Sequence, residues 1–226
     1  RNVPSLETVA VDYAPRGVKF YYIYKALAHP ENNGYIQPFT LEERLLHVQE
    51  AKRTLGSGIE WICDNMNNGL KAALGGAPNS EFIIDPAGKI IRVRGWSNAT
   101  SLRADLESLV GKVSPATTVA DLKMKSVVPK RPTATGIVPR IQINSVMRAV
   151  QVKPLESDEP YYVKLRAEVD ESFMSEGLGM AYLGFHLDPL LHVHWNNLAA
   201  PIQFRVQCPV GITMGPGAGR GPEIKV

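Results

Sequence analysis

The sequence predicts an α/β domain followed by an all-β domain, and three observations lead to this prediction. Residues 1–112 alternate strand-like apolar runs with segments of helical periodicity, which is typical of βα units. Residues 113–140 are rich in proline and carry five Lys or Arg residues against one Asp, as expected for a solvated, basic linker. Residues 141–226 contain short strand-like runs between turn residues, which favours an antiparallel β-sandwich.

The overall composition fits this two-domain prediction. The chain has 226 residues, of which 44% are hydrophobic and 21% charged, as in ordinary globular proteins. The net charge of +3 is too small to suggest nucleic-acid binding. No apolar run approaches the roughly 18 residues of a membrane span, so no transmembrane segment is expected. The chain opens with Arg1 inside a helix-like segment and ends in a strand-like run, so we interpret it as a fragment with an incomplete second domain.

The first half of residues 1–112 predicts helix, strand and helix in that order. Residues 2–13 place apolar side chains at helical spacing, and residues 18–25 (VKFYYIYK) are typical of a buried central strand. A loop over residues 26–39 follows. Thr40 then begins a helix, and Glu43 stands at the reciprocal position of a capping box.

The second half of this domain predicts a βα unit and a hairpin. Residues 59–63 form a short strand, and a helix follows to about Leu74. Pro78 leads into two apolar runs, residues 82–84 and 89–93, which an Asp-Pro-Ala-Gly turn separates, as in a β-hairpin. A proline directly before a buried strand is where a cis peptide is most often used. Helix 99–110 ends the domain, whose sheet we expect to be mainly parallel with an antiparallel last strand.

The second domain shows no helical periodicity. Its turn-rich end, from Gly215 to Pro222 (GPGAGRGP), lacks the Lys-Ser/Thr of a phosphate-binding loop and is interpreted as a flexible turn. The expected strands are residues 141–152, 161–169, 180–186, 192–195 and 202–206.

Three separated segments of the first domain resemble one family. They are YIYKALAHPENNGY, TLEERLLHVQEAKRTL and WICDNMNNGLKAALGGAPNSEFIIDPAGKIIRVRGW. In order and spacing they are similar to the iodothyronine deiodinases and to the deiodinase-like bacterial redoxins of the thioredoxin superfamily. The resemblance covers about residues 1–110 and implies a thioredoxin-like fold. The residues that match the family's motifs are His29, Gly34, Asp64, Met66, Asn67 and Pro78.

The departures from the family pattern shape the expected function. The family's cysteine or selenocysteine nucleophile ends a motif that would directly precede Arg1, so the nucleophile and the first strand are expected upstream of this chain. Leu27 replaces a glutamate of the histidine motif, and Tyr35 replaces its tryptophan. Hormone recognition is therefore not expected. The resemblance implies a more general thiol/disulfide or peroxide-type oxidoreductase.

Residues 161–222 carry a second resemblance. The segments GMAYLGFHLDPLLHVHWNN and PIQFRVQCPVGITMGPG are similar to the immunoglobulin-like N-terminal domain of DsbD-type thiol:disulfide interchange proteins. This implies an immunoglobulin-like sandwich and, because such fusions are typical of extracytoplasmic redox proteins, an exported protein. The cysteine pair of that domain is absent here, so this half is expected to dock or present the first domain.

The resemblance to the redoxins also implies a set of site residues. His29 would be the catalytic partner of the absent nucleophile, as proton donor or by lowering its pKa; the alternative is a loop histidine that caps nearby backbone. Pro78, with Ala77, would shape the substrate groove. Cys63, in a buried-looking strand, is interpreted as an inert thiol, with a redox thiol as the alternative. Asp64, Asn67 and Asn68 are expected to cap the helix that follows them.

A histidine pattern in the second domain raises a separate possibility. In His186-x5-His192-x-His194, the last two side chains would share one face of a strand, as in a copper or zinc ligand pair. The alternative is a half-exposed strand face without metal. No cofactor-binding motif is found in the sequence, and none is expected.

Two functions therefore follow from the sequence. The first is an oxidoreductase that acts on a protein thiol or disulfide, or on a small oxidised substrate. The second is a redox-inactive thioredoxin-fold scaffold whose β-sandwich mediates protein–protein assembly. A cysteine directly upstream of Arg1 would favour the first, and its absence the second.

Overall fold

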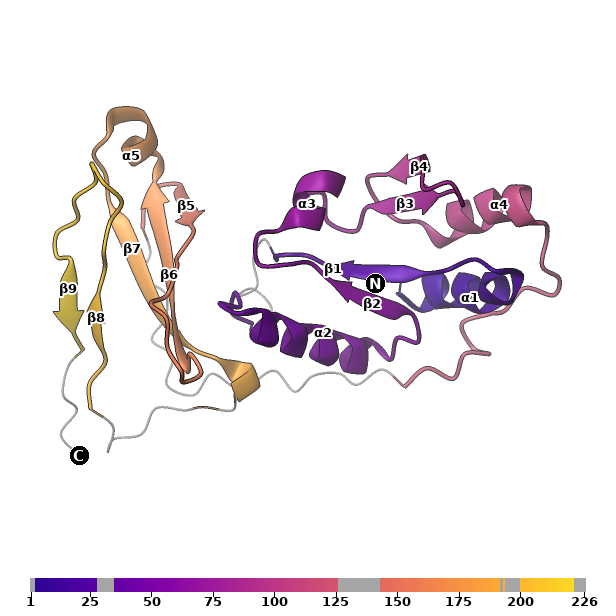
Figure 1. Ribbon diagram of the computed structural model, residues 1–226, viewed down its shortest axis with the longest axis horizontal. Helices are drawn as coiled ribbons and strands as arrows, with labels where there is room; N and C mark the ends of the chain where they lie inside the picture. Colours follow the sequence, from indigo (N-terminus) through magenta and orange to yellow (C-terminus); the bar gives the residue numbers. More distant parts are fainter. Residues whose placement is uncertain (1–2, 28–34, 126–142, 192, 194–199, 222–226) are drawn as a thin grey trace. The chain divides into compact units, whose positions relative to one another are not determined.

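The computed structural model describes residues 3–27, 35–125, 143–191, 193 and 200–221 (Figure 1). The chain divides into two compact units. The first comprises Arg1–His29 and Gln37–Arg131, and the second comprises Pro30–Ile36 and Pro132–Val226. Each unit is therefore described by itself.

The first unit contains the helices and strands that the sequence predicts. In chain order they are α1 (Val3–Tyr13), the 3-10 turn η1 (Ala14–Arg16), β1 (Tyr21–Tyr24), α2 (Leu41–Leu55), β2 (Glu60–Cys63), α3 (Gly69–Leu74), β3 (Glu81–Ile84), β4 (Ile90–Arg94) and α4 (Ala99–Val110). The capping box at the start of α2 is confirmed. The Thr40 hydroxyl accepts from the Glu43 amide at 3.2 Å, and the Glu43 carboxylate accepts from the Thr40 amide at 3.3 Å.

The four strands of this unit form two separate pairs. β1 and β2 are parallel, with Tyr21 opposite Glu60 and Tyr24 opposite Cys63. β3 and β4 form the expected antiparallel hairpin, with a bulge beside Ile83. The sequence predicts one mainly parallel sheet. Among the described residues, however, no hydrogen-bonded ladder joins β1 to β3, because each of these strands pairs with a single partner.

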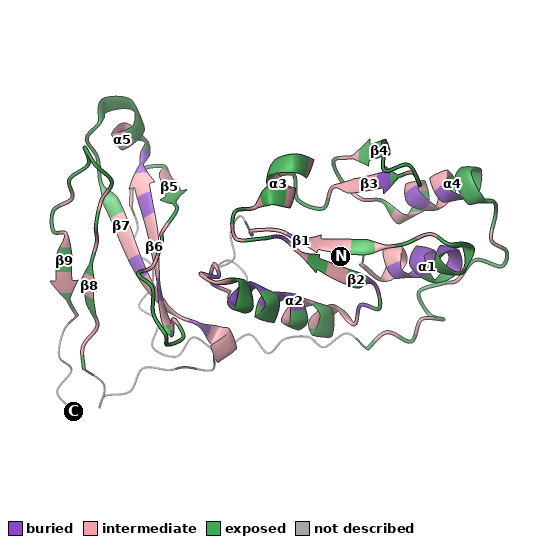
Figure 2. Ribbon diagram, in the orientation of Figure 1, coloured by how far each residue is buried: buried purple, intermediate pink, exposed green. Residues whose placement is uncertain are grey.

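The core of the first unit lies between α1, α4 and the hairpin (Figure 2). Val9 and Tyr13 lie four positions apart on α1, and Leu102 and Leu106 lie four positions apart on α4, so each helix buries one face. Ile83 of β3 completes this cluster. Burial of side chains of this size contributes about 1.5–3 kcal/mol each.

The start of the predicted linker lies against the first unit. Thr117 donates from its backbone amide and its hydroxyl to the Asp12 carboxylate of α1, the hydroxyl bond being 2.5 Å long. Val113 packs on the core cluster. A Cβ atom at Gly56 would lie 2.8 Å from the Lys125 carbonyl oxygen, so the chain also passes close to the end of α2.

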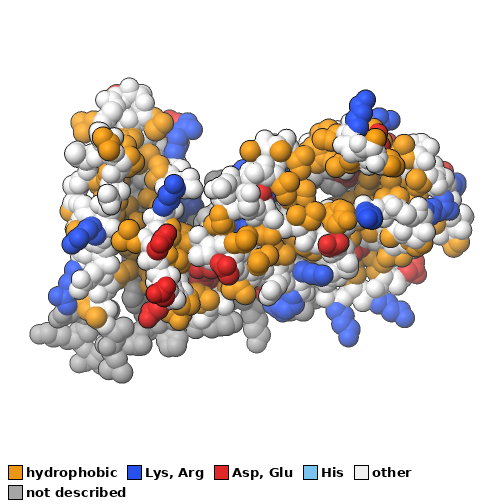
Figure 3. Space-filling model, in the orientation of Figure 1, with side chains coloured by type: hydrophobic (Ala, Val, Ile, Leu, Met, Phe, Trp, Pro, Cys, Tyr) orange, Lys and Arg blue, Asp and Glu red, His pale blue; other side chains and the backbone are white. Residues whose placement is uncertain are grey.

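One side of the hairpin is open to solvent. Ile84, Val93 and Trp96 are 56%, 62% and 65% exposed. Ile84 and Val93 alternate with residues that face α4, because side chains along a strand point to opposite faces. Figure 3 shows hydrophobic side chains, in orange, spread over the visible face of this unit.

The second unit is built from two antiparallel sheets. β5 (Met147–Val150), β6 (Val163–Asp170) and β7 (Ala181–Leu187) form one, and β8 (Gln203–Arg205) pairs with β9 (Ala218–Arg220) in the other. The rings of Phe185 on β7 and Phe204 on β8 lie 5.1 Å apart, centroid to centroid, so apolar faces of the two sheets meet.

Two elements of this unit differ from the sequence prediction. A short helix, α5 (Glu171–Glu176), joins β6 to β7, where only strands and turns are expected. Asp170 caps it by accepting from the Phe173 amide. The glycine-rich end, interpreted as a flexible turn, contains β9, because its backbone pairs with β8. The expected strand 192–195 lies, apart from residue 193, outside the described residues, and the turn η3 (Pro189–Leu191) precedes it.

Candidate functional site

The carboxyl ends of β1 and β2 form the best-defined polar cluster of the first unit. Tyr24 ends β1 and Cys63, directly opposite, ends β2. Helix α2 places Arg44 and His47 at the same end, one turn apart. Because α/β domains carry their sites at the carboxyl ends of parallel strands, this cluster is the candidate functional site.

Arg44 lies at the centre of the cluster. Its side chain is 1% exposed, and Nη1 donates to the carbonyl oxygens of Asp64 at 3.2 Å and Asn65 at 2.5 Å. A third bond joins Nη1 to the Asn68 side chain at 3.2 Å. The guanidinium therefore holds the loop after β2 through three oxygen acceptors. Its Nε atom is buried without a hydrogen-bond partner among the described residues.

The expected helix cap after β2 exists, and Asp64 contributes to it as predicted, together with Asn65. The Asp64 carboxylate, 1% exposed, accepts from the backbone amides of Leu70 and Lys71 in the first turn of α3, both at 2.9 Å. The Asn65 side chain accepts from the Gly69 amide at 2.9 Å. Asn68, which the sequence predicts as part of the cap, has a left-handed backbone, and its side-chain oxygen accepts from Arg44 instead. The Asp64 carboxylate thus has a structural role, because it caps the start of α3.

A buried tyrosine–histidine pair adjoins this loop. The Tyr24 hydroxyl lies 2.9 Å from Nδ1 of His47, and the two rings meet edge to face at 79°. Both side chains are buried, at 9% and 4% exposure. The pair links β1 to α2 at the strand ends.

Cys63 is not an activated nucleophile. Burial raises the pKa of its thiol, and the nearby Arg44 guanidinium opposes this without reversing it. The sulfur donates to the Asp64 carbonyl oxygen at 3.4 Å. Because the thiolate is the reactive form of cysteine, a raised pKa keeps this thiol unreactive at neutral pH.

The predicted groove residues lie at the same end of the unit. Lys25, directly after β1, donates from Nζ to the carbonyl oxygens of Gly75 at 2.9 Å and Ala77 at 3.1 Å. Ala77 and Pro78 are themselves exposed. The cis bond expected before a strand is not at this proline: the cis peptides among the described residues are Ser114–Pro115 and Gly215–Pro216.

The histidine predictions lie outside the described residues. This holds for His29, the expected catalytic partner, and for His192 and His194, the expected metal pair. His186 is described and stands on β7, opposite Lys164. Within the part of the chain that the structure describes, no group of three or more His, Cys, Asp or Glu side chains could hold a metal ion.

The second unit buries a row of charged side chains that sequence reasoning missed. On β6 the alternating positions 164, 166, 168 and 170 are charged, and Lys164 is wholly buried in an ion pair with Asp188. Arg166 and Glu168 pair at 2.7 Å on the same face. Charges that are buried in pairs offset much of their desolvation cost, so this row is interpreted as structural.

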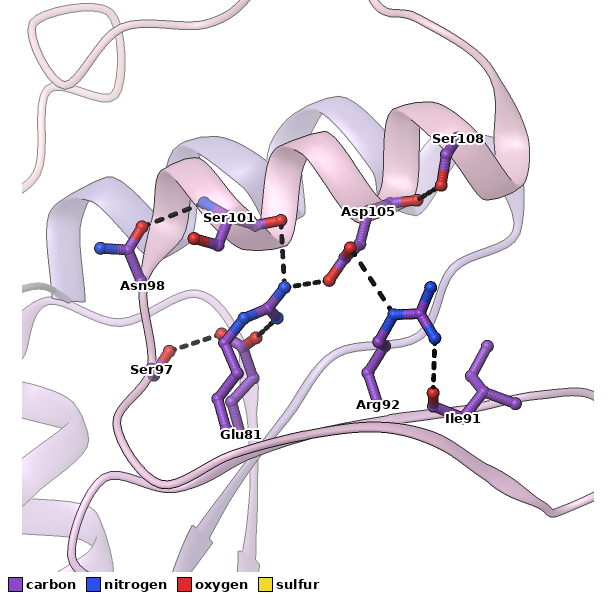
Figure 4. A network of polar contacts seen from close by, with 9 residues as sticks. Glu81, Ile91, Arg92, Ser97, Asn98, Ser101, Asp105 and Ser108 are labelled. Carbon is purple, nitrogen blue, oxygen red and sulfur yellow. Dashed lines mark hydrogen bonds and ion pairs between the residues drawn. The ribbon is translucent and has the colours of Figure 1, made fainter.

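A second polar network joins the hairpin to α4 (Figure 4). The Arg94 guanidinium pairs with Glu81 across the hairpin and with Asp105 on α4, while Ser97 donates to Glu81 at 2.8 Å. Arg92 contacts Asp105 from the same strand, at 3.8 Å. Its groups are paired with one another, so the network is a clamp and not a candidate site.

The comparisons with known proteins add no assignment. No protein-family model, no curated protein and no solved structure matches this chain. In the described residues, no helix has the length and apolar character needed to span a membrane.

Proposed function

We propose that this chain is part of a thiol/disulfide or peroxide-type oxidoreductase of the thioredoxin superfamily, with its nucleophile upstream of Arg1. One observation carries the proposal. The exposed Ala77–Pro78 loop is tied by Lys25 to the end of β1, which is where the parallel pair β1–β2 ends. An exposed loop held at the carboxyl ends of parallel strands is suited to bind a substrate.

In this proposal, the attacking group is a residue outside the described part of the chain. A thiolate must attack a disulfide sulfur, and the sulfur that leaves as a thiolate must take up a proton. Burial raises the pKa of the Cys63 thiol, so this proposal does not use Cys63 as the attacking thiolate. A cysteine directly before α1 would supply the attacking thiolate, and His29 would protonate the leaving group.

The second unit has a supporting role in this proposal. Its two sheets meet through Phe185 and Phe204, as in a small sandwich. In the described residues its titratable groups are structural pairs such as Lys164 and Asp188. We propose that it docks a partner or presents the first unit, in an exported protein of the DsbD-like kind.

A thiol assay on the native protein tests the proposal. The natural chain is isolated, its N-terminus is sequenced, and its thiols are alkylated before and after reduction. We expect a cysteine a few residues before Arg1 that is alkylated after reduction, together with reduction of oxidised glutathione or peroxide. A native chain without that cysteine, or one with no turnover of either substrate, would contradict the proposal.

One observation favours the redox-inactive scaffold as a second candidate. The thiols of this chain are Cys63 and Cys208, one in each unit, and burial keeps the first protonated. A redox-inactive scaffold needs no reactive thiol, so these two cysteines are compatible with it. It predicts that replacing both cysteines by serine leaves assembly with partner proteins unchanged, whereas the oxidoreductase predicts activity that depends on an upstream cysteine.

A further inference from the structure

We infer that Lys25 is the positioning residue of the substrate edge formed by Ala77 and Pro78; this rests on the proposed function. The loop between α3 and β3 has little burial of its own, since Gly75 through Asn79 are all exposed. Exposed loops change conformation readily unless polar bonds fix them. The polar bonds that fix this loop therefore set the shape of the substrate edge.

The Lys25 ammonium makes two of these bonds. Nζ lies 2.9 Å from the Gly75 oxygen and 3.1 Å from the Ala77 oxygen, so two carbonyls on one side of the loop point at a single cation. Gly75 allows this turn because it adopts φ of +87°, a conformation that side chains disfavour. The two acceptors lie 50 and 52 positions along the chain from Lys25, so the bonds hold the loop against β1.

A second anchor holds the other side of the loop. The Asn79 carbonyl accepts from the Ser97 amide at 2.7 Å, which ties the loop to the segment that follows β4. Pro78 thus lies between two anchors while its ring stays open to solvent. A backbone that is fixed on both sides and exposed in the middle is pre-organised for a ligand, because the ordering cost is met before binding.

Lys25 also connects this edge to the end of β1, because it is the residue directly after that strand. One side chain therefore sets the distance between the end of β1 and the substrate edge. Removing its donors should weaken substrate binding, seen as a raised KM, and leave the chemical step, seen as kcat, nearly unchanged.

Three variants test this inference. Lys25→Met keeps most of the aliphatic stem and removes the donors, Lys25→Arg keeps a positive charge with N–H donors, and Lys19→Met removes an exposed lysine just before the same strand. The first measurement is hydrogen exchange of the Ser97 amide, which donates to the Asn79 carbonyl oxygen of this loop, in the full chain. We expect exchange to be about tenfold faster in Lys25→Met. This factor corresponds to the lower limit of the free energy of a hydrogen bond from a charged donor. We expect no change in Lys25→Arg or Lys19→Met.

The second measurement is the steady-state reduction of oxidised glutathione by the native chain that includes the upstream cysteine. We expect Lys25→Met to raise KM about tenfold and to leave kcat within twofold of the unsubstituted chain. Lys25→Arg should have the same KM as the unsubstituted chain. Faster loop exchange with unchanged KM would overturn the inference and leave the proposed function standing. A native chain without turnover would contradict the proposed function. The hydrogen-exchange measurement alone would then test the inference about Lys25, and unchanged exchange in Lys25→Met would overturn that inference.

Discussion

Replacing Arg44 by methionine should destabilise the first unit by about 2 kcal/mol. The guanidinium is 1% exposed and donates to three acceptors in the loop after β2. Nη1 has two N–H groups, so the three acceptors share two donors, and two bonds from a charged donor at about 1.5 kcal/mol each give about 3 kcal/mol. We subtract about 1 kcal/mol, because methionine removes a buried charge whose Nε has no partner among the described residues. The carbonyls of Asp64 and Asn65 lose this donor in the variant.

Urea unfolding measures this change. With an m value of about 2 kcal/mol/M, the loss lowers the midpoint by about 1 M. Arg53→Met is the matched control, because Arg53 lies on the same helix, is 56% exposed and pairs with Glu50 three positions away. An exposed pair of this kind contributes about 0.5 kcal/mol or less. If Arg44→Met and Arg53→Met unfold at the same midpoint, then Arg44 does not hold the loop and the reasoning is wrong.

Three further predictions concern titration and the hairpin clamp. In a Cys208→Ser background, the alkylation rate of Cys63 should rise with pH around a midpoint above that of an unperturbed cysteine thiol, because burial raises its pKa; a midpoint at or below that of an unperturbed thiol would contradict the buried thiol. Burial also raises the pKa of Asp12, but hydrogen bonds from Thr117 and from Arg103 outweigh it and lower this pKa overall. Asp12→Asn should therefore destabilise the chain at pH 7, and the difference in unfolding free energy should shrink as the pH falls from about 4 through the lowered pKa; a difference that stays constant down to pH 2 would refute this. Arg94→Met should lower the melting temperature and speed exchange of the β4 amides, since the hairpin loses its ion pairs with Glu81 and Asp105, whereas unchanged exchange would show that packing alone holds the hairpin.

Local patterns predict the elements of the first unit well. The capping box at Thr40 and Glu43 gives the start of α2, and the apolar runs on either side of the Asp-Pro-Ala-Gly turn give the hairpin. These signals act between residues a few positions apart, so they can be found without knowing the fold. The same holds in the second unit for β6 and β7. α5 was missed because its six residues are too short for a helical period to appear.

The candidate site was harder to predict. Sequence reasoning placed Ala77, Pro78 and Cys63 in the site, but it did not find Arg44, His47 or Lys25. Arg44 and His47 lie in a helix whose charged residues suggest a solvated surface, yet both are buried. Their one available signal is their spacing on α2, which puts them on one face with Val48.

The sequence by itself determined, to within a few residues, where the helices and strands of the first unit lie. These properties depend on capping, turn and periodicity signals between near neighbours. Tertiary structure decided which side chains meet: Lys25 with Ala77, Arg44 with the loop after β2, and Asp12 with Thr117. Such contacts join residues 20 to 105 positions apart, and they form only once strand register and helix docking have fixed the backbone.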